Sequence, residues 1–350
     1  MTEITVHPVH PDDAADLYEM VRDPRVNATL VQSPSMEFSE TQKWMEERKP
    51  GQHRFVAEVD GKVVGSCGLT QFLNPRVRHI GKLGLMVHAD YWGQGVGSAL
   101  MAAQMNLADH WLNLHRVQLD VLTDNPAAIH LYEKFGFAIE GTKRMNVFGG
   151  DGRFHDEYQM ARLHNTESLH NSRTAPSPPP RPPRRQASQP VDIRAMHPDD
   201  LDDLHDLWRH PAVARTTLQL PSQEISFARE RVGTLPRGGH RLVSVVEGKV
   251  VGTIFLFQGQ NPRMAHTGDL GMMVHPDYWG MGIGSGLMAA ILEIADNWLN
   301  LRRVELEVNV DNPPAVKLYE KFGFEIEGTM PFHTFGDGRW ADSYFMGRIN

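Results

Sequence analysis

Residues 87–101 read VHADYWGQGVGSALM, and residues 274–288 read VHPDYWGMGIGSGLM. In each stretch, glycines occupy every second position just before an apolar run. Two interpretations fit this pattern: a tight turn that joins a strand to a helix, or a backbone cradle for a phosphate group. Glycine allows both, because it adopts left-handed backbone conformations and leaves the free N–H groups at a helix start open to an anion.

The two stretches belong to a unit that the chain carries twice. Residues 187 positions apart are repeatedly identical, as His10 and His197 are. The register holds from about residue 5 to Gly149 and then slips by one residue. A repeat of this length indicates tandem domains rather than a solenoid. We therefore expect domains at 1–163 and 191–350, joined by a linker at 164–190 that is rich in Pro, Ser and Arg.

The composition argues against several classes of protein. The chain has 350 residues and a formal net charge of −8, so it lacks the basic surplus typical of nucleic-acid-binding proteins. Cys67 is the only cysteine, which excludes an intramolecular disulfide and a cysteine-based zinc site. The start MTEITVHPVHPDD has no signal-peptide pattern, and no apolar run reaches the roughly 18 residues of a membrane span. We expect a cytoplasmic protein without metal, nucleic-acid or membrane partners.

Strand and helix patterns alternate within each copy, which predicts a mixed α/β (α+β) fold with a mostly antiparallel sheet flanked by helices. The turn signal Asp60-Gly61 between two apolar runs predicts a hairpin. In the first copy, strands are expected near 4–9, 53–59, 62–69, 79–88, 116–122, 137–145 and 155–162. Helices are expected from residue 10 to Arg22-Asp23-Pro24, near 39–48, from the glycines to about Leu112, and over 125–135.

The glycines match neither of two familiar phosphate-binding motifs. A dinucleotide fingerprint requires G-x-G-x-x-G, and a P-loop requires a lysine directly after its last glycine. Here Ser98 follows Gly97, and the second copy is the same in this respect. Gly93, Gly95 and Gly97 nevertheless remove the Cβ atoms that would keep a phosphate from the amides, and Gly280, Gly282 and Gly284 repeat them.

A second motif lies downstream and decides between the two interpretations. DVLTDNPAAIHLYEKFGF (120–137) places Asn125 and Tyr132 seven residues apart, about two helical turns, and EVNVDNPPAVKLYEKFGF (307–324) repeats the spacing. Together with V-x-P-x-Y-x-G-x-G-x-G, this pattern resembles the GCN5-related N-acetyltransferase (GNAT) family. The resemblance covers both copies almost end to end and implies two tandem GNAT-fold domains. One departure is Trp92 and Trp279, where the family often has Arg or Gln.

The resemblance implies acetyl-CoA as the donor, with one molecule in each domain. Its pyrophosphate would contact the amides of the glycine stretch, its pantetheine arm would add to the edge of the preceding strand, and an asparagine would fix that arm. The implied donor-binding residues are Leu85, Met86, Val87, Gly93, Gln94, Gly95, Val96, Gly97, Ser98 and Asn125, with Met272, Met273, Val274, Gly280, Met281, Gly282, Ile283, Gly284, Ser285 and Asn312 in the second copy.

Direct transfer through a tetrahedral intermediate needs two proton movements. An amine with a pKa near 10 must lose a proton before it attacks, and the departing thiolate gains one. By resemblance, Tyr132 and Tyr319 are the acids that protonate the thiolate. Asp120 and Glu307 stand where some relatives carry a base, and each needs a pKa raised by partial burial to act near neutral pH. An ordered water chain is the alternative base.

The acceptor is less defined than the donor. Gln32 and Gln219 lie in the loop that shapes the acceptor pocket in the family, and Arg76 and Arg263 are candidates for binding a substrate carboxylate. Lys82 corresponds to Asp269, and residues 145–147 correspond to the dissimilar 332–334, so the two pockets need not accept the same amine.

The leading hypothesis is an enzyme that transfers an acetyl group from acetyl-CoA to the primary amine of a small molecule, such as an amino acid or an amine-bearing antibiotic. Two alternatives stay open. In the first, one copy binds acyl-CoA without turnover, as a sensor or structural half of a pseudo-dimer within the chain. In the second, the acceptor is a protein N-terminus. Further homo-oligomerisation is also open.

Overall fold

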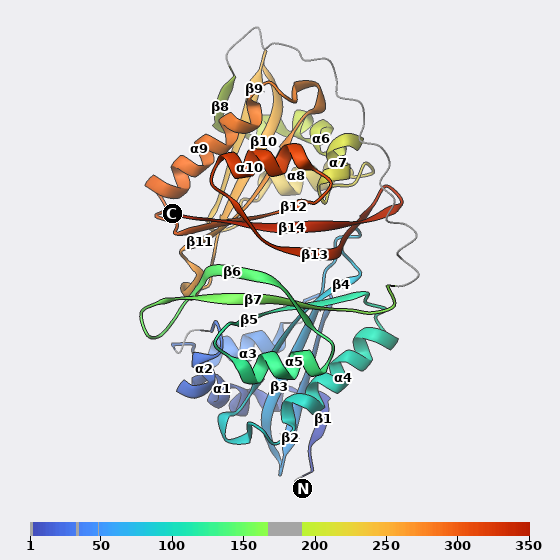
Figure 1. Cartoon of the computed structure of the whole chain (residues 1–350), viewed down its shortest axis with the longest axis vertical. Coiled ribbons are helices and arrows are strands. Elements are labelled where there is room, and N and C mark those ends of the chain that lie inside the picture. Colours follow the sequence, from blue (N-terminus) through green and yellow to red (C-terminus); the bar gives the residue numbers. More distant parts are fainter. Residues whose placement is uncertain (1–2, 33–34, 48, 167–190) are drawn as a thin grey trace. The chain divides into compact units, whose positions relative to one another are not determined.

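The computed structural model describes residues 3–32, 35–47, 49–166 and 191–350. The chain divides into two compact units, unit 1 (Met1–Asn171) and unit 2 (Ser172–Asn350) (Figure 1). The predicted linker lies outside the described residues from position 167 onward. At its start, the His164 N–H donates a hydrogen bond of 3.0 Å to the His115 carbonyl, which extends the strand pairing just before it.

Unit 1 contains one mixed sheet in which the strands follow the order β1-β2-β3-β4-β5-β7-β6. All neighbouring strands are antiparallel except β4 and β5. The strands are β1 (Thr5–Pro8), β2 (Gln52–Val59), β3 (Lys62–Gln71), β4 (Ile80–Val87), β5 (Arg116–Leu122), β6 (Ala138–Phe148) and β7 (Phe154–Leu163).

Helices cover both faces of this sheet (Figure 1). Apolar side chains of β3, β4 and β5 pack with α4 and α5 into one core cluster that includes Leu83, Leu100 and Tyr132. A smaller cluster, with Leu17 and Met45, packs α1 and α3 against the opposite face. The helices are α1 (Ala14–Arg22), α2 (Pro24–Ala28), α3 (Phe38–Glu46), α4 (Val96–His110) and α5 (Pro126–Lys134).

Unit 2 repeats this architecture with the strand order β8-β9-β10-β11-β12-β14-β13, and β11 and β12 are its parallel pair. Its strands are β8 (Asp192–Ala195), β9 (Gly239–Val246), β10 (Lys249–Gln258), β11 (Thr267–Val274), β12 (Arg303–Asn309), β13 (Glu325–Gly336) and β14 (Arg339–Ile349). Its helices are α6 (Leu201–Arg209), α7 (Pro211–Thr216), α8 (Ile225–Gly233), α9 (Ile283–Asn297) and α10 (Pro313–Lys321). Clusters under α9 and α10 and under α6 and α8 fill its two faces.

The predicted mixed α/β class with a mostly antiparallel sheet is confirmed, and the Asp60-Gly61 turn joins β2 to β3 with φ values of 50° and 77°. The Asp23-Pro24 pair ends α1 as expected, but it also starts a short helix, α2, that we did not expect. Asp23 Oδ1 accepts a hydrogen bond of 2.8 Å from the Arg25 N–H, and Pro24 stands at the first helical position, so the same residues serve as a stop and a start.

Candidate active site

In unit 1, the parallel strands β4 and β5 separate after a short contact. Their pairing ends at Lys82 opposite Gln118, whereas the other edge of β4 stays paired with β3 as far as Val87. In the described part of unit 1, the second half of β4 therefore has one edge that no strand covers. Backbone N–H and C=O groups on such an edge can pair with an extended ligand. Leu85, Met86 and Val87 lie on this half of β4.

Unit 2 has the same fork. The parallel pairing of β11 with β12 ends at Asp269 opposite Glu305, and β11 stays paired with β10 as far as Val274. Within the described residues, the second half of β11, which holds Met272, Met273 and Val274, is thus uncovered along its β12 side. Both predicted pantetheine edges lie at a position where an added strand could pair.

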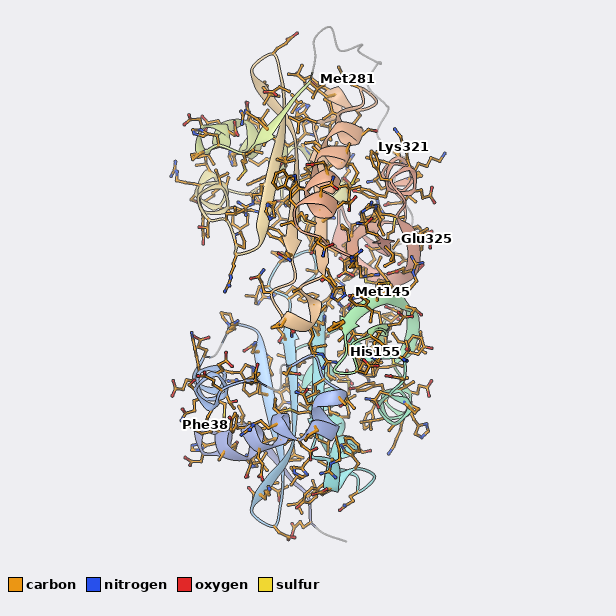
Figure 2. All side chains as sticks on the ribbon, turned by 90° about the vertical axis from the view of Figure 1, so that its left-hand side faces the viewer. Phe38, Met145, His155, Met281, Lys321 and Glu325 are labelled. Atoms are coloured by element: carbon orange, nitrogen blue, oxygen red, sulfur yellow. The ribbon has the colours of Figure 1, made fainter. Side chains whose placement is uncertain are left out.

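The glycine stretch of each unit forms a turn at the mouth of the fork. Gly93 and Gly95 have φ values of 74° and 92°, and Gly280 and Gly282 have 80° and 84°. A Cβ on Gly93 would meet no atom within 4 Å, so the backbone conformation, not packing, requires glycine there. Figure 2 labels Met281 between the last two of these glycines.

Helix α4 begins directly after this turn without a side-chain cap from the described residues. The N-cap is Gly95, and the same holds for Gly282 at the start of α9. The amides of Val96, Gly97 and Ser98, and of Ile283, Gly284 and Ser285, therefore form the first turns of two uncapped helices. Such a helix start is suited to an anion, because its N–H groups and the helix dipole both favour negative charge.

Gly97 and Gly284 are glycines for a reason that we did not expect. A Cβ on Gly97 would come within 2.9 Å of Leu131 Cδ2 on α5, and one on Gly284 within 3.0 Å of Leu318 Cδ2 on α10. These glycines let two helices pack closely. They do not primarily open the way to a phosphate.

Trp92 and Trp279 bind the end of the strand that carries the uncovered edge. Trp92 Nε1 donates a hydrogen bond of 2.8 Å to the carbonyl of Val87, and Trp279 Nε1 donates one of 2.7 Å to the carbonyl of Val274. The indole thus fixes the glycine turn to the strand, and it uses one acceptor of the predicted pantetheine edge.

A lysine on α5 also approaches the glycine cradle in unit 1. Lys134 Nζ lies 3.3 Å from Ser98 Oγ, which brings a positive charge to the first turn of α4. The corresponding Lys321 ends α10 in unit 2, with Nζ 5.6 Å from the ring centroid of Phe322 (Figure 2). Neither lysine was predicted to be a site residue, although both stand in the repeated LYEKFGF motif.

Tyr132 and Tyr319 lie on α5 and α10 and are buried in the core clusters beside the fork. Burial raises the pKa of Tyr132 far above its ordinary value and raises the pKa of Tyr319 to about 12. Both phenols therefore stay protonated at neutral pH, which is the state that an acid requires. Asn125 Oδ1 caps α5 by accepting a hydrogen bond of 3.2 Å from the Ala128 N–H, whereas the Asn312 side chain makes no such bond at α10.

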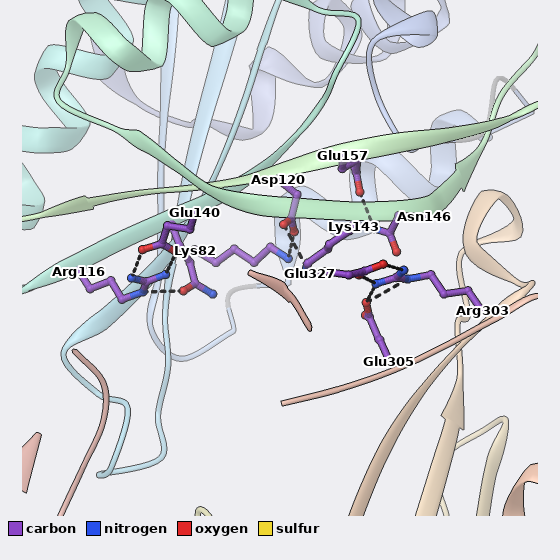
Figure 3. A network of polar contacts seen from close by, with 11 residues as sticks. Lys82, Arg116, Asp120, Glu140, Lys143, Asn146, Glu157, Arg303, Glu305 and Glu327 are labelled. Atoms are coloured by element: carbon purple, nitrogen blue, oxygen red, sulfur yellow. Dashed lines mark hydrogen bonds and ion pairs between the residues drawn. The ribbon is translucent and has the colours of Figure 1, made fainter. Parts of the chain in front are cut away.

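Asp120 lies just beyond the point where β4 and β5 separate. Lys82 Nζ is 2.7 Å from its Oδ2 and Lys143 Nζ is 3.1 Å from its Oδ1 (Figure 3). Burial acts to raise the pKa of Asp120, but the charges and hydrogen bonds of Lys143 and Lys82 outweigh it and hold the pKa well below its usual range. The expectation of a raised pKa at Asp120 is therefore wrong, because the lysines favour the carboxylate.

Another carboxyl in unit 1, Glu157 on β7, does have a raised pKa. Burial is the main cause of the raised pKa, and the charge of Asp120 raises it further. The hydrogen bond of 2.6 Å that Asn146 Nδ2 donates to Glu157 Oε2 acts in the opposite direction and lowers the pKa (Figure 3). The pairing of Leu122 with Glu157 and of Asp120 with Gln159 places both acids on the same face of the sheet. Sequence reasoning missed Glu157.

The equivalent place in unit 2 is built differently. Glu307 is half exposed, and its Oε2 lies 3.7 Å from Nε2 of the buried His333. His333 Nδ1 lies 3.0 Å from Ser343 Oγ, which lies 3.3 Å from Asn309 Oδ1. This chain of polar groups leads from the point where β11 and β12 separate to buried residues of unit 2. His333 was also missed, although the difference between residues 145–147 and 332–334 pointed to this segment.

The predicted acceptor residues fall into two groups. Gln219 is buried and its Oε1 accepts a hydrogen bond of 3.1 Å from Arg231 Nη1, whereas Gln32 Oε1 is buried and has no partner among the described residues. Arg76 and Arg263 lie in the turns that precede β4 and β11. The structure therefore places both arginines at the end of the strand opposite to the glycine cradle.

Residues 15–137 and 201–324 match the model of the Acetyltransferase (GNAT) family. The L-amino acid N-acetyltransferase AaaT of Escherichia coli K12 is 38% identical over 157 residues, which are 45% of this chain and 96% of that protein. The spermidine N(1)-acetyltransferase of Escherichia coli K12 is 29% identical over 109 residues, which are 31% of this chain and 57% of that protein.

The chain is also similar to solved structures. A GNAT-family acetyltransferase from Streptococcus pneumoniae has 30% sequence identity and a TM-score of 0.42, and the match covers 46% of this chain and 100% of that chain. A spermidine N-acetyltransferase from Vibrio cholerae, in complex with CoA and spermine, has 23% identity and a TM-score of 0.42 over 46% of this chain and 95% of that one. No helix in the described parts of the chain has the length and apolar character needed to cross a membrane.

Proposed function

Because this chain belongs to the GNAT acetyltransferase family, in which acetyl-CoA is the donor, we propose that each of its two units binds one acetyl-CoA and transfers the acetyl group to the primary amine of a small molecule. The acceptor class that we propose first is an amino acid, because the relative AaaT is an L-amino acid N-acetyltransferase. The second acceptor class that we propose is a polyamine, because other relatives are spermidine acetyltransferases.

One observation carries the proposal: the uncapped helix start and the uncovered strand edge meet in both units. The amides at Gly93–Ser98 and Gly280–Ser285 suit a pyrophosphate, and Lys134 adds positive charge in unit 1. The edges at 85–87 and 272–274 suit an extended amide chain. A phosphate group and a peptide-like arm are the two parts of CoA that these features would hold.

The thioester of the donor supplies an activated acetyl group. Strand N–H groups at the fork can donate hydrogen bonds to the carbonyl oxygen of this group as negative charge develops on it. Tyr132 and Tyr319 are protonated, and we propose that each donates its phenolic proton to the leaving sulfur. Asn125 and Asn312 stand at the starts of the helices that carry these tyrosines.

The proton of the acceptor ammonium leaves by different routes in the two units. In unit 1 we propose Glu157, since its pKa is raised and Asp120 is held by two lysines. In unit 2 we propose Glu307 with His333, which lies 3.7 Å away and continues to Ser343. Water molecules could connect either group to the amine.

The proposal is tested by placing a negative charge in one glycine turn at a time, at residues 93–98 in unit 1 or 280–285 in unit 2. Gln94 in unit 1 corresponds to Met281 in unit 2, and both lie in the glycine turn. Gln94→Glu and Met281→Glu should each repel the pyrophosphate and weaken CoA binding to their own unit by about tenfold or more, which is ~1.4 kcal/mol. Calorimetry should find two CoA per wild-type chain and one strong site in each variant.

The matched controls exchange the two neutral residues: Gln94→Met and Met281→Gln should leave both sites intact. Release of free thiol from acetyl-CoA in the presence of amino acids or polyamines measures transfer. A stoichiometry of one in the wild type would contradict a donor site in each unit. Absence of thiol release with every amine would contradict the proposed transfer.

A second function is favoured by one observation in unit 1, the double ion pair of Asp120. If Lys82 and Lys143 prevent the Asp120 carboxylate from accepting a proton and no other group replaces it, unit 1 binds acyl-CoA without turnover and serves as a sensor. The Met281→Glu variant separates the two cases. Transfer by unit 1 would persist in this variant if unit 1 is an enzyme, whereas bound CoA without thiol release would indicate the sensor.

A further inference from the structure

Unit 2 contains a small pocket that is rich in arginine and aromatic residues, here called the arginine pocket. It lies between helices α6 and α8 and the strands β9 to β11, and has a volume of about 20 Å³. A cavity of this size holds about one water molecule or one oxygen atom of a ligand. The residues that matter for its chemistry are Trp208, Arg231, Arg241, Phe255, Phe257 and Met273.

The two arginines bring positive charge into apolar surroundings. Arg231 lies 5.0 Å from the ring centroid of Trp208, and Arg241 lies 6.0 Å from that of Phe257. Their hydrogen bonds go to neutral oxygens: Arg231 Nη1 donates to Gln219 Oε1, and Arg241 Nη1 donates to the backbone carbonyl of Arg231. Burial lowers the pKa of Arg231, as does the nearby charge of Arg241, and burial also lowers the pKa of Arg241.

Across the described residues, neither arginine forms an ion pair with an Asp or Glu side chain. Two guanidinium groups that repel each other without a counter-charge are unfavourable in a partly buried site. The pocket therefore holds positive charge that no carboxylate of the described residues balances. An anion supplied from outside the chain would balance it.

A third donor points to the same kind of ligand. The Trp208 side chain is 5% exposed, and its Nε1 is buried without a hydrogen-bond acceptor among the residues that the structure describes. A buried indole N–H normally has an acceptor. An anionic oxygen in the pocket would accept from the indole and from the arginines at once.

Unit 1 shows that the fold does not require this pocket. Trp44 replaces Arg231, Val21 replaces Trp208, and Gly68 and Thr70 replace the two phenylalanines. Arg54, the counterpart of Arg241, donates to the backbone carbonyls of Trp44 and Met45 at 2.5 and 3.0 Å. The second arginine and the unpaired indole are thus particular to unit 2.

The pocket adjoins both parts of the proposed transfer site. Met273 lines it and belongs to the β11 edge proposed for the donor, and Gln219, which binds Arg231, belongs to the loop expected to shape the acceptor site. We propose that the arginine pocket binds the carboxylate of an amino-acid acceptor in unit 2, with one carboxylate oxygen accepting from Arg231, Arg241 and Trp208. This inference rests on the proposed function and makes unit 2 selective for acceptors that carry a carboxylate.

The test uses the full chain with the unit 1 cradle blocked by Gln94→Glu. Initial rates of thiol release are measured with pairs of acceptors that differ only in the carboxylate, such as leucine and isoamylamine or phenylalanine and phenethylamine. Arg231→Met and Arg241→Met should each raise the KM of the amino acid about tenfold or more, with little change for the amine. Arg229→Met, on an exposed position of α8, is the matched control and should change neither.

Direct binding distinguishes this inference from the proposed function. Thermal unfolding of the wild-type chain is measured with leucine, phenylalanine or sodium chloride. An amino acid should stabilise the chain, and Arg231→Met and Arg241→Met should each reduce this stabilisation without changing the affinity for CoA. This result stands even if no acceptor is acetylated. Three results would overturn the assignment. The arginine variants could lose activity equally with the amino acid and the amine, or neither variant could lose activity. Chloride alone could stabilise the chain while the KM of the amino acid stays unchanged in the variants.

Discussion

Lys82 Nζ and Asp120 Oδ2 form an ion pair of 2.7 Å across the point where β4 and β5 separate. In unit 2 the corresponding residues are both acidic, Asp269 and Glu307. The two units therefore present different charges at the point where the parallel strands separate. This difference, rather than any difference in the glycine cradle, is the main reason to predict that the two units prefer different acceptors.

The ion pair should contribute to the stability of the folded chain in a pH-dependent way. The pKa of Asp120 is lowered in the folded state, so its contribution is complete above the unfolded pKa near 4 and is lost as the pH falls toward the folded pKa. Lys82→Met should reduce the free energy of unfolding by about 1 kcal/mol at pH 7, a modest value because Lys82 is half exposed.

Urea denaturation at pH 7 and pH 3 measures this effect. The loss caused by Lys82→Met should be smaller at pH 3, and it should also be smaller when Asp120→Asn is already present. An equal loss in both backgrounds would show that Lys82 acts through contacts other than the Asp120 carboxylate.

The indole of Trp92 should control the affinity for the donor. Trp92→Phe removes the hydrogen bond to the Val87 carbonyl, which loosens the glycine turn from the strand end. We expect the Kd of CoA for unit 1 to rise about threefold to tenfold, in keeping with the loss of roughly 1 kcal/mol for one hydrogen bond. Calorimetry in the Met281→Glu background isolates this site, and Trp111→Phe, a change at a highly exposed indole, is the control. An unchanged Kd would limit Trp92 to a structural role.

Removal of the phenol should slow transfer without weakening binding. Tyr319→Phe leaves the ring in its core position but removes the proton that we assign to the leaving sulfur, so kcat of unit 2 should fall tenfold or more at an unchanged Kd for CoA. Because the pKa of Tyr319 is about 12, the phenol should cause no decline in rate below about pH 11. Tyr132→Phe should do the same in unit 1. If neither variant lowers kcat tenfold, the assignment of the acid is wrong.

Much of the fold could be read from the sequence, because its signals are local. The strand expected at 116–122 matches β5, and the glycine turn and the Asp60-Gly61 hairpin lie where their dipeptides predict. The proposed donor-binding residues come from motifs whose members are close along the chain, and their role in binding stays a prediction. The short helix α2 was missed because the dipeptide Asp23-Pro24 fits the end of one helix as well as the start of another.

The acceptor side could not be predicted in the same way. Glu157 is brought beside Asp120 by the β5–β7 pairing, and no local pattern shows that its pKa will be raised. The lowered pKa of Asp120 likewise depends on Lys82 and Lys143, which come from two other strands. Motif spacing does not reveal charges that meet only through sheet register. These charges are the reason that we propose Glu157 rather than Asp120 as the base of unit 1.

Glu157 provides the sharpest test of this conclusion, because stability and activity should move in opposite directions. The pKa of Glu157 is raised in the folded state, so ionisation of its carboxyl group disfavours folding. This destabilisation is small at low pH and grows as the pH rises past the ordinary glutamate pKa of about 4.5. Glu157→Gln should therefore leave the melting temperature at pH 4 nearly unchanged and raise or maintain it at pH 8. The Asn146 Nδ2 group keeps an oxygen acceptor in this variant.

The same substitution should lower kcat/KM of unit 1 tenfold or more, measured as thiol release in the Met281→Glu background, since glutamine cannot accept the ammonium proton. Asp120→Asn is the matched comparison and should cost unit 1 less activity but more stability, because it leaves Lys82 and Lys143 without their shared carboxylate. The reverse ranking, with Asp120→Asn the more damaging to the rate, would return the role of base to Asp120 and require its lysines to move when the acceptor binds.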